Sequence, residues 1–121
     1  MNEIEKEIQA KNLTAPRVTP QRIEEVISAE YYFTAQDGIR GNAIRERKGY
    51  SDSESNPLNL LTFCVLVLRN GFTVTGESAC VSPENFDAEL GKKIARQNAV
   101  DKIWALEGYL LKEKLSNGPT N

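Results

Sequence analysis

The stretch Leu60–Ile103 decides the fold; it reads LLTFCVLVLRNGFTVTGESACVSPENFDAELGKKIARQNAVDKI. Its first part, about residues 60–69, is rich in β-branched and aromatic residues, which predicts a strand that is apolar on both faces. Asn70-Gly71 predicts a tight hairpin turn, because both residues tolerate positive φ. The alternating run at about residues 72–80 predicts the return strand. Together these features predict an antiparallel β-hairpin.

A two-residue loop at Asn70-Gly71 fixes the expected register of this hairpin. The expected pairs on the core face are Val67–Val74, Val65–Gly76 and Phe63–Ser78. The opposite face would then carry Cys64, Leu66, Leu68, Thr73, Thr75 and Glu77. Because that face is partly aliphatic, we expect a terminal segment or another subunit to cover it.

The hairpin is followed by a helix and preceded by a helix and a strand. Ser82-Pro83 predicts the start of a long C-terminal helix from Pro83, since serine caps and proline loses no hydrogen bond at the first helical position. Thr19-Pro20 predicts an N-terminal helix in the same way. The aromatic run 31–33 predicts a short strand that completes the sheet. The fold class is therefore α+β.

The remaining segments are mostly polar, and they indicate how the chain is divided. Residues 1–18 are an N-terminal extension with a weak amphipathic helix pattern, and residues 19–115 form a single domain. Within that domain, residues 34–59 contain several glycines and a serine-rich run, which predicts a long polar loop. Residues 116–121 are predicted to be a disordered tail.

Composition narrows the classes of function. The 121 residues carry a formal net charge of -2 and no histidine, which removes the commonest general base and the usual zinc ligand. We therefore expect no enzyme, no catalytic residue, no cofactor and no metal. The two cysteines fall on opposite hairpin faces and are expected to stay reduced, as in a cytoplasmic protein. No run is long and apolar enough for a membrane span, so no membrane partner is expected.

Two sets of side chains are candidates for contacts outside the fold. The candidates for ligand or nucleic-acid contact are Arg40, Arg45, Arg47, Lys48, Lys92, Lys93 and Arg96. The candidates for self-association are Leu66, Leu68, Trp104, Tyr109 and Leu111. An exposed charged helix face and an apolar core give the simpler explanation of the same patterns.

The amino-acid sequence of the second half of the chain resembles that of a known family. The segment from Asn70 to Trp104, with Leu106-Glu107-Gly108-Tyr109 after it, resembles small bacteriophage proteins named after gene products forty-nine and sixty-six of two enterobacterial phages. The resemblance covers about residues 60–115. It implies a phage or prophage origin and expression inside a bacterial cell, and it transfers no catalytic residue.

The leading hypothesis is a non-enzymatic phage accessory protein, acting as a homo-oligomer that binds a host factor or a small ligand. One alternative is a nucleic-acid-binding module, because the order helix, strand, hairpin, helix is similar to that of double-stranded-RNA-binding domains. The other is an anti-defence protein that sequesters a nucleotide signal in a pocket between subunits.

Overall fold

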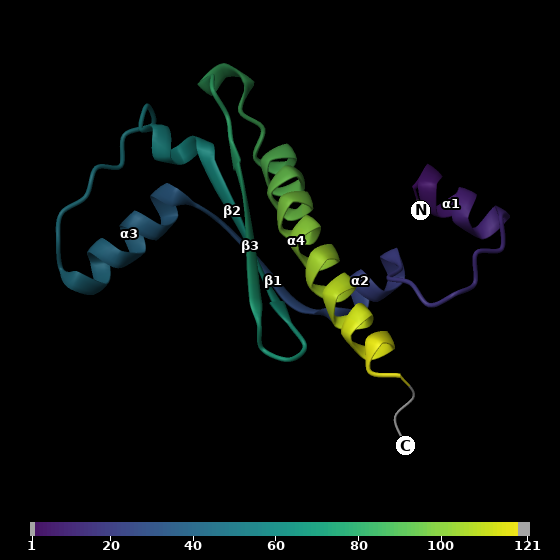
Figure 1. Ribbon diagram of the computed structural model, residues 1–121. Helices are drawn as coiled ribbons and strands as arrows, with labels where there is room; N and C mark the ends of the chain where they lie inside the picture. Colours follow the sequence, from purple (N-terminus) through teal and green to yellow (C-terminus); the bar gives the residue numbers. More distant parts are fainter. Residues whose placement is uncertain (1, 119–121) are drawn as a thin grey trace.

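A computed structural model describes residues 2–118 as a three-stranded antiparallel sheet with one long helix packed across it (Figure 1). The helices are α1 (Glu3–Ala10), α2 (Pro20–Val26), α3 (Ala35–Glu46) and α4 (Ala88–Ser116), and the strands are β1 (Ile27–Thr34), β2 (Leu61–Leu68) and β3 (Thr73–Ala79). Short 3-10 helices, η1 (Pro57–Leu60) and η2 (Pro83–Asn85), precede β2 and α4. The strand order is β1-β2-β3, which confirms the α+β class and the predicted third strand.

The hairpin turn differs from the predicted one by a single residue. Gly71 has φ of 89° and donates its N–H to the Leu68 carbonyl at 2.9 Å, and Leu68 donates to the Phe72 carbonyl at 2.8 Å. The loop therefore has three residues, with a glycine in the left-handed region that forms a bulge. Val65 now lies opposite Thr75, and Leu66 opposite Val74, so the predicted register was wrong.

This shift exchanges the two faces of β2. Cys64, Leu66 and Leu68 point into the core, whereas Phe63 and Val65 lie on the other side of the sheet. On β3 the prediction was right, because Val74 and Gly76 are buried as expected. The face that was predicted to be the core on β2 is therefore the outer face of the sheet.

Helix α4 packs closely on the core face through small residues. A Cβ atom added to Gly76 would lie 2.2 Å from the Ala95 carbonyl oxygen and 2.3 Å from the Ala99 nitrogen. Ile103 fills the far end of this contact and is fully buried. The Asn98 side chain donates to the Glu77 carbonyl on β3 at 2.8 Å, which ties the helix to the edge of the sheet.

Helix α4 begins at Ala88 rather than at the predicted Pro83. Ser82 makes no capping hydrogen bond, and Pro83 starts only the short η2. Phe86 is extended (φ -69°, ψ 126°), which prevents η2 from running on into α4. Asp87 provides the cap instead, since its side chain accepts from the Leu90 N–H at 3.1 Å.

The predicted loop 34–59 contains a helix, so this prediction was wrong for residues 35–46. Thr34 and Asp37 form a capping box, each side chain accepting the other's backbone N–H, at 3.1 and 2.9 Å. The helix ends at Arg47, which adopts the left-handed conformation. Residues 47–56 then return to the sheet without regular structure.

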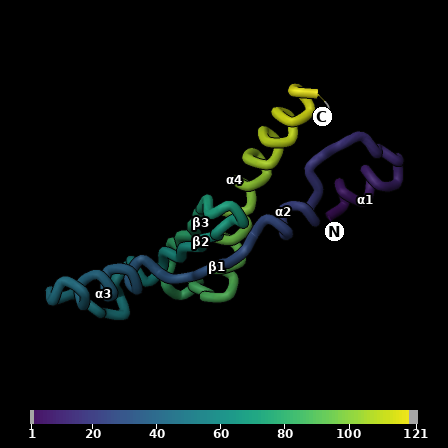
Figure 2. Tube along the Cα trace, turned by 90° about the horizontal axis from the view of Figure 1, so that it is seen from below, coloured from purple at the N-terminus to yellow at the C-terminus, as the bar shows by residue number. Residues whose placement is uncertain are grey.

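The two ends of the chain leave the body of the fold. In Figures 1 and 2, α1 stands apart from α2 and α4, joined to them by the segment 11–19. At the other end, Ser116 belongs to α4 rather than to the predicted tail, and residues 119–121 of that tail lie outside the described part of the chain. Among residues 2–118, no helix is long and apolar enough to cross a membrane.

Candidate binding surfaces

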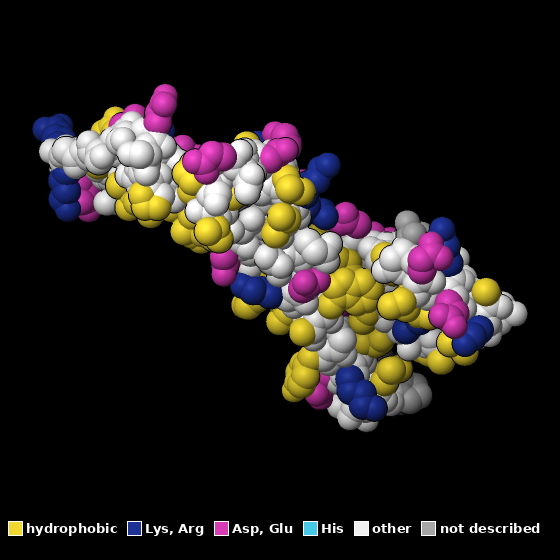
Figure 3. Space-filling model, turned by 90° about the horizontal axis from the view of Figure 1, so that it is seen from above, with side chains coloured by type: hydrophobic (Ala, Val, Ile, Leu, Met, Phe, Trp, Pro, Cys, Tyr) yellow, Lys and Arg dark blue, Asp and Glu magenta, His cyan; other side chains and the backbone are white. Residues whose placement is uncertain are grey.

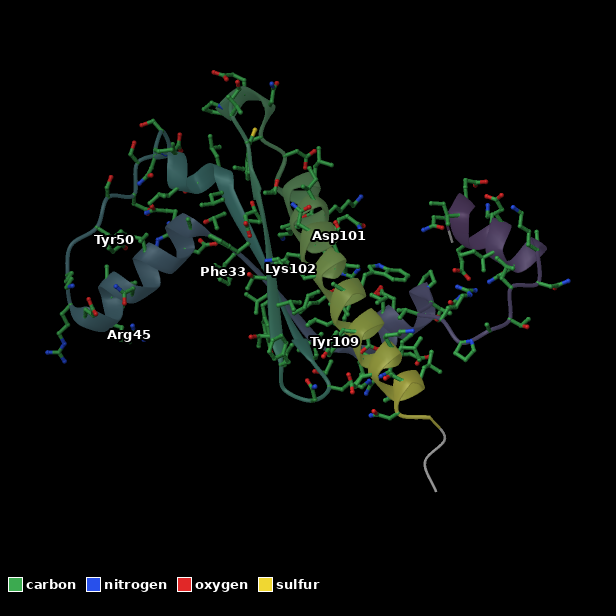
Figure 4. All side chains as sticks on the ribbon, viewed as in Figure 1. Phe33, Arg45, Tyr50, Asp101, Lys102 and Tyr109 are labelled. Atoms are coloured by element: carbon green, nitrogen blue, oxygen red, sulfur yellow. The ribbon has the colours of Figure 1, made fainter. Side chains whose placement is uncertain are left out.

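The outer sheet face is the side of the sheet opposite α4. We define it by its apolar side chains, which are Tyr31, Phe33, Leu61, Phe63, Val65 and Val67. Tyr31 is 58% exposed and Phe33 is 39% exposed, and the β2 side chains are half-buried. The rings of Phe33 and Phe63 stack with centroids 5.7 Å apart. Figure 4 shows Phe33 on the side of the sheet away from α4.

A sheet face that is exposed to water normally carries polar side chains, so the apolar side chains of this face are unusual. Aromatic side chains at the centre of an apolar patch are typical of residues that contribute most of the energy of a protein interface. The outer sheet face is therefore the strongest candidate for a contact with another molecule.

The predicted self-association residues fall in three environments. Leu66 is 0% exposed and Leu68 is 8% exposed, so the core holds both, and neither is available for a contact between chains. Trp104 is half-buried against the core, and Leu111 is half-buried in a groove beside it. Tyr109 is 73% exposed on α4 (Figure 4).

The last part of α4 diverges from the sheet (Figure 2), and we call residues 104–116 the α4 overhang. Its first turn still contacts the fold, since Trp104 packs against the core and Leu106 lies beside Val74. The overhang is about 20 Å long at 1.5 Å per residue. Arg22 of α2 holds its near end through a 2.6 Å contact with Glu107. A groove of about 260 Å³ runs between the overhang and the segment Arg17–Arg22, with Leu110 and Leu111 among its lining residues.

The N-terminal hook, residues 2–19, lies next to this groove. Arg17 donates two hydrogen bonds of 2.8 Å to Glu5, and this guanidinium lowers the pKa of the Glu5 carboxyl. The pair bends the chain back on itself and encloses a second groove of about 480 Å³ between α1 and the segment 12–19. Arg17 lines both grooves, so they meet at this residue.

The predicted basic residues at α3 mostly contact neighbouring side chains. The contacts are those of Arg40 with Asp37 and Asp52, of Arg45 with Asn42, and of Lys48 with Glu46. The hydrogen bond from Arg40 lowers the pKa of Asp52. Arg47 is exposed at the end of the helix.

Arg96 of α4 forms ion pairs with acidic residues on two other elements. Its guanidinium contacts Glu24 of α2 at 2.9 Å and Glu30 of β1 at 2.8 Å, and these carboxylates raise its pKa. Arg96 thus joins three elements, and its single positive charge is shared between two carboxylates. Lys92 lies 3.6 Å from Glu89, and Lys93 is exposed beside it.

The structure does not bring the two basic sets together. Helices α3 and α4 lie on either side of the sheet in Figure 1, so their charged side chains belong to different parts of the surface. Figure 3 shows basic and acidic side chains interspersed over the face seen from above. The described residues on this face form a mixed surface rather than a continuous basic one.

The sequence analysis did not predict the buried polar cluster around Gln36. Gln36 is fully buried and donates to the Ser51 carbonyl and to Asp52, while Asn56 donates to its side-chain oxygen at 3.1 Å. The capping box that begins at Thr34 predicts the helix that carries Gln36. Its burial depends on the later segment 51–56 folding back, which no local pattern reveals.

The core also contains titratable side chains that are poorly suited to proton transfer at neutral pH. Burial raises the pKa of Tyr32 to about 12, and it raises the pKa of the Cys64 thiol. Both cysteines are free. Within residues 2–118, no three carboxylate or thiol side chains gather in an arrangement that could hold a metal ion.

Comparison with known proteins gives one finding. The model of a family described as phage protein (N4 Gp49/phage Sf6 gene 66) matches residues 18–115. No curated protein and no solved structure matches the chain. The match covers α2, the sheet, α3 and nearly all of α4, and it leaves α1 and most of the hook outside. The chain therefore belongs to the N4 Gp49/phage Sf6 gene 66 family of phage proteins.

Proposed function

We propose that this phage protein is a non-enzymatic accessory protein that works as a homo-oligomer, binding a host factor or a small ligand inside the infected bacterium. The outer sheet face carries the proposal, because three aromatic and three aliphatic side chains remain there that the chain's own helices do not bury. Burial of apolar area is the main driving force of most protein association.

The partner is expected to dock on the outer sheet face through Tyr31. Tyr31 lies in the middle of β1, opposite Val65, and it is the most exposed side chain of this face. A carboxylate at this position would have to lose its water when a partner covers it, without an opposite charge to compensate. Tyr31→Glu is therefore expected to abolish binding while leaving the fold intact, since the side chain is not in the core.

Co-purification from infected cells tests this expectation, with mass spectrometry of both the protein and the small-molecule fractions. The native chain and the control Tyr50→Glu, which changes an exposed tyrosine beside α3, should retain the same partner. Tyr31→Glu should lose it. A partner that the Tyr31→Glu variant retains at the native amount contradicts docking on this face. A nucleotide released on denaturation would identify the small ligand as a signal molecule.

Binding of nucleic acid is a second candidate, and the start of α4 favours it. Because the helix begins at Ala88, Lys92 and Lys93 lie within its first two turns, near the positive end of the helix dipole. If this surface binds duplex RNA or DNA, affinity should fall with rising salt. It should also fall in the double variant Lys92→Glu with Lys93→Glu. Equal binding by both proteins in low-salt filter binding, or none, excludes the candidate.

A further inference from the structure

We infer that two copies of this chain associate by exchanging contacts at their ends: the N-terminal hook of each copy clasps the α4 overhang of the other. The inference rests on the proposed function, because it names the contact through which the homo-oligomer forms. It leaves the outer sheet face of each copy free for the partner. The hook stands apart from the sheet, and the far end of α4 diverges from it, at the same end of the molecule (Figures 1 and 2).

The hook is folded but lacks a core of its own. Helix α1 has eight residues, and a helix of that length is marginal in water without packing against something else. Val18, at the end of the hook, packs against the core, but Ile4 is 70% exposed and Leu13 is 56% exposed, so neither of these two is packed on the body. The Glu5–Arg17 pair fixes its shape without burying these side chains. A hook of this kind gains stability when an apolar segment fills it.

The α4 overhang is an apolar segment that could fill the hook. It carries exposed apolar side chains, which are Leu106, Tyr109, Leu110 and Leu115. Because residues 104–116 continue α4 as regular helix, they present these side chains on a rigid rod. The hook encloses a groove of about 480 Å³, which has room for side chains from such a helix.

The two surfaces lie next to each other in one copy, which favours a second copy as the occupant. The grooves of the hook and of the overhang share Arg17 as a lining residue, so they lie on either side of this side chain. An overhang from a second copy that lies in these grooves contacts the hook on one side and the first overhang on the other. A two-fold axis then places the first overhang in the second hook, and the contact closes as a dimer.

The two surfaces hold enough exposed apolar side chains to contribute to a dimer contact. Six large ones are exposed in each copy, which are Ile4, Leu13, Leu106, Tyr109, Leu110 and Leu115. A stable complex buries roughly 800 Å² on each partner. Polar neighbours on the rim of both grooves supply the rest. Association of two copies would also order α1, so helix formation and dimerisation should occur together.

The first test is the mass in solution at micromolar concentration, by sedimentation equilibrium. The native chain should have about twice the 13.5 kDa of one copy. Leu13→Glu in the hook and Leu110→Glu in the overhang should each raise the dissociation constant by about 30-fold or more, as expected for a central interface residue. Ile44→Glu, an exposed apolar position on α3, is the matched control and should leave the mass unchanged. A monomeric native chain overturns the inference, as does a dimer that both variants preserve.

Mixing the two variants decides which surfaces meet. In a dimer of Leu13→Glu with Leu110→Glu, one hook and the overhang that it clasps are both native. The mixture should therefore regain dimer that neither variant forms alone, whereas a mixture that stays monomeric overturns the pairing of hook with overhang. Tyr31→Glu should keep the dimer mass, so loss of the partner and loss of the dimer are separate results.

Discussion

Gly76→Ala is expected to destabilise the protein more than any other single methyl addition in the described chain. The new Cβ would lie 2.2 Å from the Ala95 carbonyl oxygen and 2.3 Å from the Ala99 nitrogen, and both are backbone atoms of α4. No rotamer change relieves such a contact, so the helix must move away from the sheet. Overpacking of this kind costs about 3 kcal/mol or more in the free energy of unfolding. Thermal unfolding should show a melting temperature lower by roughly 10 °C or more.

Gly108→Ala is the matched control for this experiment. Gly108 belongs to the same helix, and a Cβ added there meets no atom within 4 Å. Alanine favours a helix over glycine by about 1 kcal/mol, so this variant should be slightly more stable than the native chain. Equal stabilities for the two variants would mean that α4 does not lie directly on Gly76.

Leu66→Ala is expected to have the second large effect, and its comparison with Val65→Ala tests the register of the sheet. Leu66 is 0% exposed between the sheet and α4, so truncation leaves a cavity and costs about 2–5 kcal/mol of unfolding free energy. Val65 lies on the outer sheet face and is half-buried, so its truncation should cost roughly 1 kcal/mol. Urea unfolding of both variants measures the difference.

The alternative register predicts the reverse order. With a two-residue loop at Asn70-Gly71, Val65 would face the core and Leu66 the outside. A larger loss in Val65→Ala than in Leu66→Ala would therefore contradict the three-residue loop.

The same residues show how far the sequence could predict the fold. Asn70-Gly71 correctly predicts a turn, but the pair suits both a two-residue loop and a three-residue loop with Gly71 in the left-handed region. The usual arbiter is the hydrophobic pattern, and it fails on β2 because both faces of that strand are apolar. Only the packing of α4 identifies the core face. The ambiguity has a physical origin, since an outer face with apolar side chains looks like a core face in the sequence.

Helix α3 shows a different kind of failure. Gly38 and Gly41 each disfavour a helix by about 1 kcal/mol relative to alanine, which made a loop the better local prediction. The capping box at Thr34 and Asp37 was visible in the sequence and pointed to the helix. Burial of Gln36 and Ala43 supplies the remaining stabilisation, and that contact requires the folded chain.

The sequence could name candidate residues for the surfaces, but it could not show where those residues lie in the fold. Of the residues predicted for self-association, Tyr109 is exposed, whereas Leu66 and Leu68 lie in the core. Arg96 was predicted to be available for phosphate, and it is instead occupied by Glu24 and Glu30 from elements far away in the sequence. Such pairings depend on tertiary structure alone.

The hydrogen bond from Asn98 to the Glu77 carbonyl has a consequence for solubility. A free strand edge with open backbone groups can recruit further strands and grow into fibrils. Because an amide side chain from α4 already occupies this acceptor, an added strand could not pair with β3 at Glu77. The apolar outer sheet face can thus stay exposed while strand addition at this point of the β3 edge is blocked.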